Sequence, residues 1–296
     1  MRGIKKILIL LAMLSAFTNL NAKEIPYSEE VDSLAELFNS IANTKSDKLK
    51  KEINTYLIGY LKSFLESSES LSADFSKVKN LSVLKSDDNL LRIYTWNLAY
   101  YDGSFQYFGF LQYKDKKGVK IYFLDDKKFG AGDETRLYQT NSEWYGAIYY
   151  EIITKKWNSL TYYTLIGYDG ADFLLNRKVV EVLYFDRRGI PVFGKKLFKL
   201  NRTTTGRLIF EYADRATMIL RYNAKQDMII LDHLAPPEPR FTNLFHYYGP
   251  DFSYDAFIFR GGKWILQSDI DPDVAINYKR EPKINSLKKR GVSKNF

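Results

Sequence analysis

The sequence predicts an α+β fold in which an N-terminal pair of helices is followed by a large antiparallel β body. Apolar residues recur at helical spacing between residues 28 and 66. From residue 81 onward, short apolar stretches alternate with turn residues and no helical period intervenes. The chain is also rich in aromatic residues, at 16% of its 296 residues. Aromatic side chains favour the half-buried pleated surface of a sheet.

The first helix is predicted over residues 28–43. Ser28 can cap it, and Glu29 and Glu30 lie where the helix dipole favours negative charge. Its buried face would comprise Val31, Leu34, Ala35, Leu37, Phe38, Ile41 and Ala42. The second helix is predicted from Ser46 to about Glu66, and the short polar connection between the two predicts an antiparallel pair.

The β body is predicted to contain many short strands. The expected strands are 81–85, 90–97, 104–113, 118–124, 145–154, 160–167, 179–186, 207–213, 217–222, 227–232, 254–260 and 263–267. Turn signals such as Asp102-Gly103 and Gly261-Gly262 separate them, which favours antiparallel pairing over a parallel βαβ fold. A sandwich, a barrel and a propeller-like arrangement all remain open. The proline-rich segment 234–239 is expected to be a rigid connector at the surface or at an edge.

The N-terminus has the layout of a secretory signal peptide. Arg2, Lys5 and Lys6 precede an apolar run over residues 7–17, and small or polar residues lead to Ala22. This run would cover only about half of a ~30 Å hydrocarbon core. We predict cleavage after Ala22, a periplasmic or secreted product and no transmembrane segment in the mature chain. The predicted organisation is a signal peptide (1–22), a helical segment (23–80), an antiparallel β domain (81–278) and a basic, disordered tail (279–296).

Charge and cysteine content exclude several functions. Lys and Arg number 44 against 35 Asp and Glu, a net charge of +9. Three of these basic residues lie in the leader and seven in the tail, which holds one acid, so residues 23–278 carry 34 of each sign. Because residues 23–278 have no net charge, their charge gives no support for nucleic-acid binding. The chain has no cysteine, which excludes thiol nucleophiles, thiolate metal sites and disulfides.

Six segments resemble an exported protein family typical of Bacteroidota. They are 144–147 (WYGA), 162–170 (YYTLIGYDG), 176–178 (NRK), 191–194 (PVFG), 232–236 (DHLAP) and 248–255 (YGPDFSYD). The resemblance covers roughly residues 90–273 and implies an envelope location. The resemblance identifies no catalytic residue, since no activity is established for the family.

The sequence offers few residues for catalysis. It has two histidines, His233 and His246, and neither has the spacing of a helical zinc pair. No nucleophile elbow, Walker loop or dinucleotide fingerprint occurs. A Ser-His-Asp site would need one of the histidines beside Asp232, Asp251 or Asp255, and adjacent Asp232 and His233 would point to opposite faces of a strand. We expect a strand-end histidine that is satisfied by the backbone, and we predict no catalytic residue.

The strongest candidate for a binding surface is the aromatic stretch around residues 236–255. The predicted surface residues are Tyr247, Tyr248, Asp251, Phe252, Tyr254 and Asp255. Aromatic faces can hold a partner or stack on sugar rings, and Asp251 with Asp255 would be the carboxylate pair of a glycoside hydrolase. Asp in such contexts also organises turns.

The sequence therefore favours a non-enzymatic envelope protein that binds a ligand or partner, either a glycan or another envelope protein. The alternative is a hydrolase of glycan or cell-wall material that uses paired carboxylates, and a purely structural assembly protein is a third class.

Asp269, Asp271 and Asp273 faintly suggest a calcium loop but lack the glycine and distal glutamate of an EF-hand. We predict no metal and no cofactor. The basic tail could alternatively contact an anionic surface.

Overall fold

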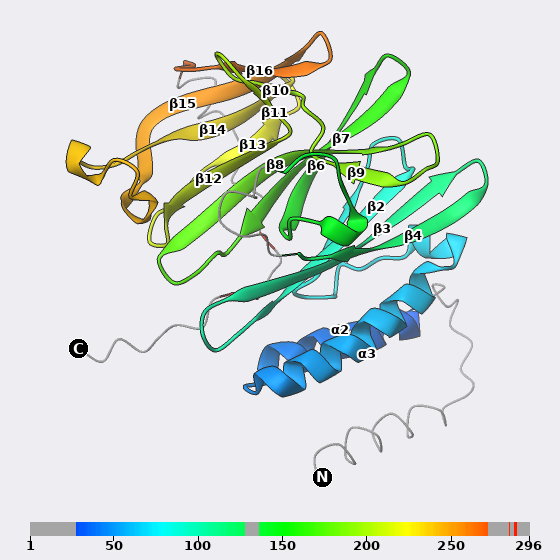
Figure 1. Ribbon diagram of the computed structural model, residues 1–296. Coiled ribbons are helices and arrows are strands. Elements are labelled where there is room, and N and C mark those ends of the chain that lie inside the picture. The colour runs from blue at the N-terminus through cyan, green and yellow to red at the C-terminus, as the bar shows by residue number, and fades with distance from the viewer. Residues whose placement is uncertain (1–27, 128–135, 272–283, 285–286, 289–296) are drawn as a thin grey trace.

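The described part of the chain stacks a helical layer and three β-sheets in four successive layers (Figure 1). This computed structural model describes residues 28–127, 136–271, 284, 287 and 288. The predicted signal peptide lies outside these residues. The predicted fold class is confirmed, and of the three arrangements left open, the sandwich is the one closest to this face-to-face stack.

The helical layer and the first sheet come from the first 125 residues. The helices are α2 (Ser28–Asn43) and α3 (Asp47–Leu65), followed by the 3₁₀ turn η1 (Ser68–Ser72). The first sheet has the order β1 (Ser82–Lys85), β2 (Leu91–Ala99), β3 (Phe105–Asp115) and β4 (Gly118–Asp125), all antiparallel.

The second sheet lies in the middle of the stack. Its order is β5 (Gln139–Thr140), β9 (Pro191–Phe193), β8 (Leu175–Phe185), β7 (Leu160–Asp169) and β6 (Ile148–Trp157), and β12 (Arg207–Ala213) also pairs with β8. The 3₁₀ turn η2 (Asn141–Glu143) precedes β6.

The third sheet forms the outer layer. Its order is β11 (Thr204–Thr205), β10 (Phe198–Lys199), β16 (Lys263–Gln267), β15 (Gly249–Arg260), β14 (Met228–Ala235) and β13 (Leu220–Asn223). The turns η3 (Pro239–Phe241) and η4 (Phe245–Tyr247) join β14 to β15. Among the described strands, β10 and β16 form a parallel pair, which the antiparallel prediction did not include. The short strands β5, β9, β10 and β11 were also not predicted.

Three apolar clusters fill the spaces between the layers. Helix residues such as Phe38 pack against Trp96 of β2, whose Nε1 donates to Asn54 Oδ1 at 2.7 Å. The next cluster joins the other face of the first sheet to the middle sheet, and the third joins the middle sheet to the outer sheet. Neighbouring residues on β8 show the alternation, since Val179 faces the first sheet and Val180 the outer one. The middle sheet is therefore apolar on both faces.

A fully buried ion pair ties β8 to β12. Arg207 Nη2 lies 2.6 Å from Glu181 Oε2, and both side chains are 0% exposed. Tyr149 donates its hydroxyl hydrogen bond to the other Glu181 oxygen, and Arg207 also donates to Gln139 Oε1 at 2.7 Å. Each charge is thus matched by a partner and by further hydrogen bonds, the condition under which a buried pair is tolerated.

Part of the predicted disordered tail is held by the fold. Leu287 N donates to Asn97 Oδ1 at 3.0 Å, and Asn97 Nδ2 donates to Leu287 O at 3.1 Å. Leu287 packs against the clusters on both faces of the first sheet, and Ile284 packs against both clusters of the middle sheet. The apolar side chains of Ile284 and Leu287 are thus partly buried against the sheets. No helix among the described residues has the length and apolar character needed to cross a membrane.

Candidate functional site

The predicted binding surface centres on an irregularity between β14 and β15. Asp232 pairs with Tyr254 and Leu234 pairs with Pro250, so the single residue His233 faces three residues of β15. These three residues, Asp251, Phe252 and Ser253, are called the Phe252 bulge below. A bulge of this kind re-aims side chains at an edge or site.

The bulge is closed by its own first residue. Asp251 Oδ1 accepts hydrogen bonds from Ser253 N at 3.0 Å and from Ser253 Oγ at 2.7 Å. Phe252 between them has φ of 70° and an exposed fraction of 87%. A bulky residue with positive φ is an outlier. The backbone conformation of the bulge thus keeps the Phe252 ring exposed to solvent.

His233 and Asp255 form an ion pair beside the bulge. His233 Nδ1 lies 3.0 Å from Asp255 Oδ2, and the other oxygen of Asp255 accepts from Asp269 N at 3.0 Å. The His233 side chain is 49% exposed. The prediction that the backbone satisfies this histidine was wrong, because the irregular register brings a carboxylate within reach. As predicted from adjacency, Asp232 does not pair with His233; it is buried and accepts from Ile219 N at 2.6 Å.

Both charges of the site are favoured by their surroundings. The hydrogen bond to Asp255 raises the pKa of His233, and the Asp251 charge adds to that effect. Burial alone would raise the pKa of Asp251, but the hydrogen bonds from Ser253 outweigh it and lower that pKa. Around neutral pH the bulge therefore carries an anionic Asp251, and His233 opposite it protonates more readily than an ordinary histidine.

The other predicted residues divide into two groups. Tyr247 stacks on Phe241 with ring centroids 4.3 Å apart, and Tyr248 packs against Phe245 at 5.0 Å. Tyr247 is thus the last residue of η4, and Tyr248 follows it directly. Tyr254 instead packs with a small cluster of Ile230, Ala256 and Ile270, and its carbonyl accepts from Ile270 N at 2.8 Å. The Tyr254 side chain is thus half-buried against this cluster.

Two further loops connect to this surface and were not predicted. The Phe173 ring lies against Gly103, which joins the β7–β8 loop to the β2–β3 loop. Leu174 O accepts from Asp214 N, and Tyr248 O accepts from Ala213 N, each at 2.9 Å. In Figure 1 the β2–β3 and β7–β8 loops, the end of β12 and the η3–η4 turns all lie on the left side of the stack. Tyr101 and Leu174, at the tips of the first two loops, are 81% and 64% exposed.

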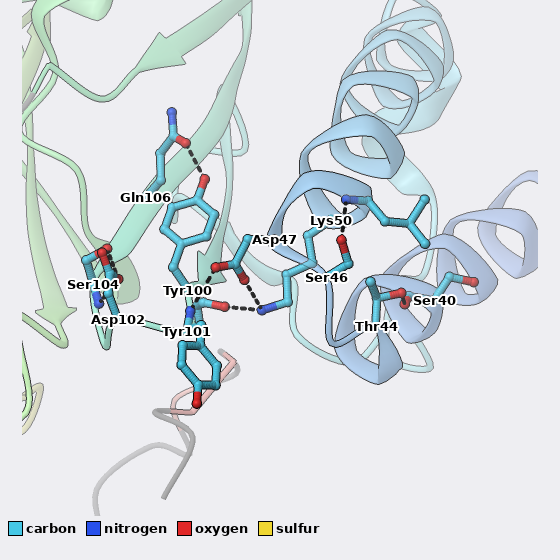
Figure 2. Close-up of polar contacts among 12 residues, drawn as sticks. Ser40, Thr44, Ser46, Asp47, Lys50, Tyr100, Tyr101, Asp102, Ser104 and Gln106 are labelled. Carbon is cyan, nitrogen blue, oxygen red and sulfur yellow. Dashed lines mark hydrogen bonds and ion pairs between the residues drawn. The ribbon is translucent and has the colours of Figure 1, made fainter. Parts of the chain in front are cut away.

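The tip that carries Tyr101 is braced by the first turn of α3 (Figure 2). Asp47 Oδ2 accepts from Tyr101 N at 3.0 Å, and the buried Lys50 donates to Ala99 O and to Asp47 Oδ1. Tyr100 beside it donates to Gln106 Oε1 at 2.6 Å, and burial raises the pKa of this tyrosine to about 12. Figure 2 shows the Tyr101 ring pointing away from Asp47 and Lys50. These hydrogen bonds thus fix the backbone of the β2–β3 loop, while the Tyr101 ring is exposed to solvent.

Asp251 and Asp255, the predicted carboxylate pair, have different hydrogen-bond partners. Asp251 binds Ser253 and Asp255 binds His233 and Asp269, so each is occupied by a different partner. Ser253 Oγ donates to Asp251, so it is not aligned as a nucleophile activated by His233. Among the described residues, no group of three His, Cys, Asp or Glu side chains is placed to hold a metal ion.

No protein-family model matches the chain, and no curated protein or solved structure matches it significantly. The assignment of the site therefore depends on its geometry and chemistry alone.

Proposed function

We propose that this protein is an exported, non-enzymatic binding module that uses the Phe252 bulge to anchor a partner protein in the envelope. The observation that carries the proposal is Phe252, a bulky residue at φ 70° that is 87% exposed. The left-handed conformation costs an L-residue roughly 1–2 kcal/mol. The ring gains no burial in return, and strain of this kind is typical of residues that act in binding.

The surroundings of Phe252 support a protein partner. Protein interfaces combine a central aromatic anchor with a polar rim. Here His233 lies opposite the bulge on β14, and Asp251 directly precedes Phe252 in the chain. The aromatic turn η4, with Phe245 and Tyr247, comes just before β15.

The hydrolase alternative is weaker on the same geometry. A glycoside hydrolase needs one carboxylic acid whose pKa is raised, so that it can donate a proton. Hydrogen bonds from Ser253 lower the pKa of Asp251 against the effect of burial. Asp255 uses its two oxygens for His233 and Asp269 N.

The proposal of export rests on the signal-peptide layout of residues 1–22 and on the family resemblance. N-terminal sequencing of the protein from its native host should give a mature chain that begins at Lys23. A mature chain that retains Met1 or the apolar run would contradict export by cleavage.

A photo-cross-linking experiment tests the binding function. A photoreactive phenylalanine analogue is placed at position 252, and a matched control is placed at Trp157, which is 42% exposed beside Gly262 at the other end of β15. In envelope extract we expect one discrete protein adduct from position 252 and none from 157. Excess wild-type chain should compete for the adduct, and excess Phe252→Gly chain should not.

Three outcomes would overturn the proposal. They are the absence of an adduct at 252, the same adduct from both positions, and equal competition by Phe252→Gly. The Phe252→Gly chain should be at least as stable as the wild type, because glycine accepts positive φ without strain. Loss of competition would then report loss of binding and not loss of folding. Glycan binding that depends on Phe252 would favour the glycan class instead.

A further inference from the structure

Four turns at one end of the stack form a continuous surface, called the four-turn surface below. They are the β3–β4 turn, the β6–β7 tip, the β8–β9 loop and the β15–β16 turn, taken as residues 114–120, 156–160, 186–190 and 260–263. In Figure 1 these turns lie toward the upper right of the stack, and the start of β15, which carries the Phe252 bulge, lies on the left. The four-turn surface is therefore a separate feature from the proposed partner site.

Contacts between the turns make this surface continuous across all three sheets. Tyr122 of β4 donates its hydroxyl hydrogen bond to Gly189 O of the β8–β9 loop. Because β7 and β8 pair antiparallel, the start of β7 lies beside the end of β8 and the loop that follows it. The Trp157 ring at the β6–β7 tip lies against Gly262 of the β15–β16 turn.

The four-turn surface carries a large surplus of positive charge. Its segments hold nine Lys and Arg residues and two acids. The acids pair with two of the nine, Asp115 with Lys120 at 2.7 Å and Asp186 with Arg188 at 3.1 Å. The other seven cations are exposed and make no ion pair with a described residue; they are Lys114, Lys116, Lys117, Lys156, Arg187, Arg260 and Lys263. A surplus of this size attracts an anionic partner.

The neighbouring charges do not cancel this surplus. The adjoining β1–β2 turn adds two acids, Asp87 and Asp88, which brings the count to nine cations against four acids. At the other end of the stack, the loops 100–104, 170–174 and 249–253 hold three acids and no Lys or Arg. The chain is thus polarised along the stack, although residues 23–278 are neutral overall.

An apolar pair stands at the β6–β7 tip within this basic surface. Trp157 and Leu160 are paired across the hairpin, and each is 42% exposed. Asn158 and Ser159 between them have φ of 46° and 62°, as in a tight two-residue hairpin turn. The hairpin and the contact with Gly262 therefore fix two apolar side chains at the surface, between cationic turns.

We propose that the four-turn surface docks this protein on an anionic lipid surface, with Trp157 and Leu160 in the headgroup region. Lys and Arg close to a membrane are attracted to anionic lipids, and tryptophan favours the membrane–water interface. A soluble polyanion would neutralise the cations but would leave the two apolar side chains in water. Docking by this end would point the Phe252 bulge away from the lipid.

Vesicle sedimentation tests the docking. It uses the chain that begins at Lys23, so that the predicted leader adds no apolar segment. Phosphatidylcholine vesicles that contain about one-third phosphatidylglycerol should bind at least about tenfold more strongly than vesicles of phosphatidylcholine alone. Equal binding to the two kinds of vesicle would overturn the proposal.

Tryptophan fluorescence reports which surface touches the lipid. The chain has four tryptophans, of which Trp157 is exposed and Trp96, Trp144 and Trp264 are buried. Anionic vesicles should shift the emission to shorter wavelength, and phospholipids with brominated acyl chains should quench part of it. Trp157→Phe should still sediment with the vesicles but should lose both signals. Binding without a shift, or signals that persist in Trp157→Phe, would contradict docking by this surface.

Charge variants locate the electrostatic contact. One variant replaces three exposed cations of the surface by Gln, namely Lys116, Lys117 and Arg187. Its control replaces three exposed lysines from the helices and the segment after them, namely Lys48, Lys62 and Lys79. The first should bind anionic vesicles at least about tenfold more weakly, and the control should bind like the wild type. An equal loss in both would show that only net charge matters and would refute the proposal.

Two other occupants are distinguished by the same assay. A chain that ends after Lys288 lacks the basic residues Lys289, Arg290 and Lys294 and should still bind; loss of binding would assign the lipid contact to the C-terminal tail. Dextran sulfate should bind more weakly than anionic vesicles of equal charge and should leave the Trp157 emission unchanged. Binding to dextran sulfate as strong as to the vesicles would assign the surface to a polyanion instead.

Discussion

The backbone of Leu287 and the side chain of Asn97 exchange two hydrogen bonds, although 190 residues separate them in the chain. Asn97 is buried on β2, at 3% exposed. Its amide therefore depends on the C-terminal segment for both of its observed partners. The basic end of the chain contributes to the fold through a residue that is not charged.

Truncation before Ile284 should destabilise the protein. Removal of residues 284–296 leaves the Asn97 amide buried without these partners, and an unsatisfied buried polar group costs about 1–3 kcal/mol. The matched control ends after Lys288 and keeps Leu287. Urea unfolding should show a loss for the first truncation and near wild-type stability for the second. Equal stability of the two chains would contradict a role for Leu287.

Arg207→Met should cause a large loss of stability. The substitution leaves Glu181 without its cation in a site where both side chains are 0% exposed. Removing one partner of a buried pair typically costs about 3–5 kcal/mol. The double variant Glu181→Met with Arg207→Met should recover much of this loss, because no buried charge remains. A double variant that is as unstable as the single one would show that packing, and not charge, sets the cost.

Asp255→Asn should lower the pKa of His233. The folded protein raises this pKa above 6.5, chiefly through the Asp255 hydrogen bond. Stabilisation from a raised histidine pKa is fully present below the unfolded pKa and is lost as pH rises through the folded pKa. Asp255→Asn should therefore cost more stability at about pH 5.5 than at about pH 8.5.

The neighbouring acid provides the comparison for this effect. Asp251 contributes a weaker, purely Coulombic part of the His233 shift. NMR titration of His233 should show a larger fall in pKa for Asp255→Asn than for Asp251→Asn. A larger fall in the His233 pKa for Asp251→Asn would show that the charge of Asp251, and not the Asp255 hydrogen bond, is the main cause of the raised pKa.

Gly103→Ala should disturb the two loops that meet at Phe173. A Cβ on Gly103 would lie 2.2 Å from the Phe173 ring, and the backbone there has φ of +83°. We expect a loss of roughly 1–3 kcal/mol from the positive φ and the clash. Phe173→Ala in the same chain should restore only the part due to the clash. Full recovery would mean that the backbone conformation carries no strain.

Local signals predicted most of the fold. The stripe from Val31 to Ile41 is buried, and Ser46 caps α3 by accepting from Leu49 N. Long strands such as β3 carry enough alternation and enough turn residues at their ends to be located. Strands of two or three residues, such as β10, carry no period and form because Phe198 packs in a core built by distant segments.

The site was predicted less completely, because its contacts join distant parts of the chain. The aromatic composition of residues 236–255 pointed to Phe252 but gave no indication of its positive φ. The partner of His233 is 22 residues away and depends on the irregular register of β14 and β15.

The middle sheet sets the order in which this chain can complete its structure during synthesis. Its first strand, β5, begins at Gln139, but one of its faces is covered by strands as late as β16, which ends at Gln267. Until then the emerging chain carries a sheet with an uncovered apolar face, the kind of intermediate that aggregates. Contacts between segments so far apart also form slowly. A chaperone that retains the nascent chain until β16 has emerged would therefore raise the yield of native protein.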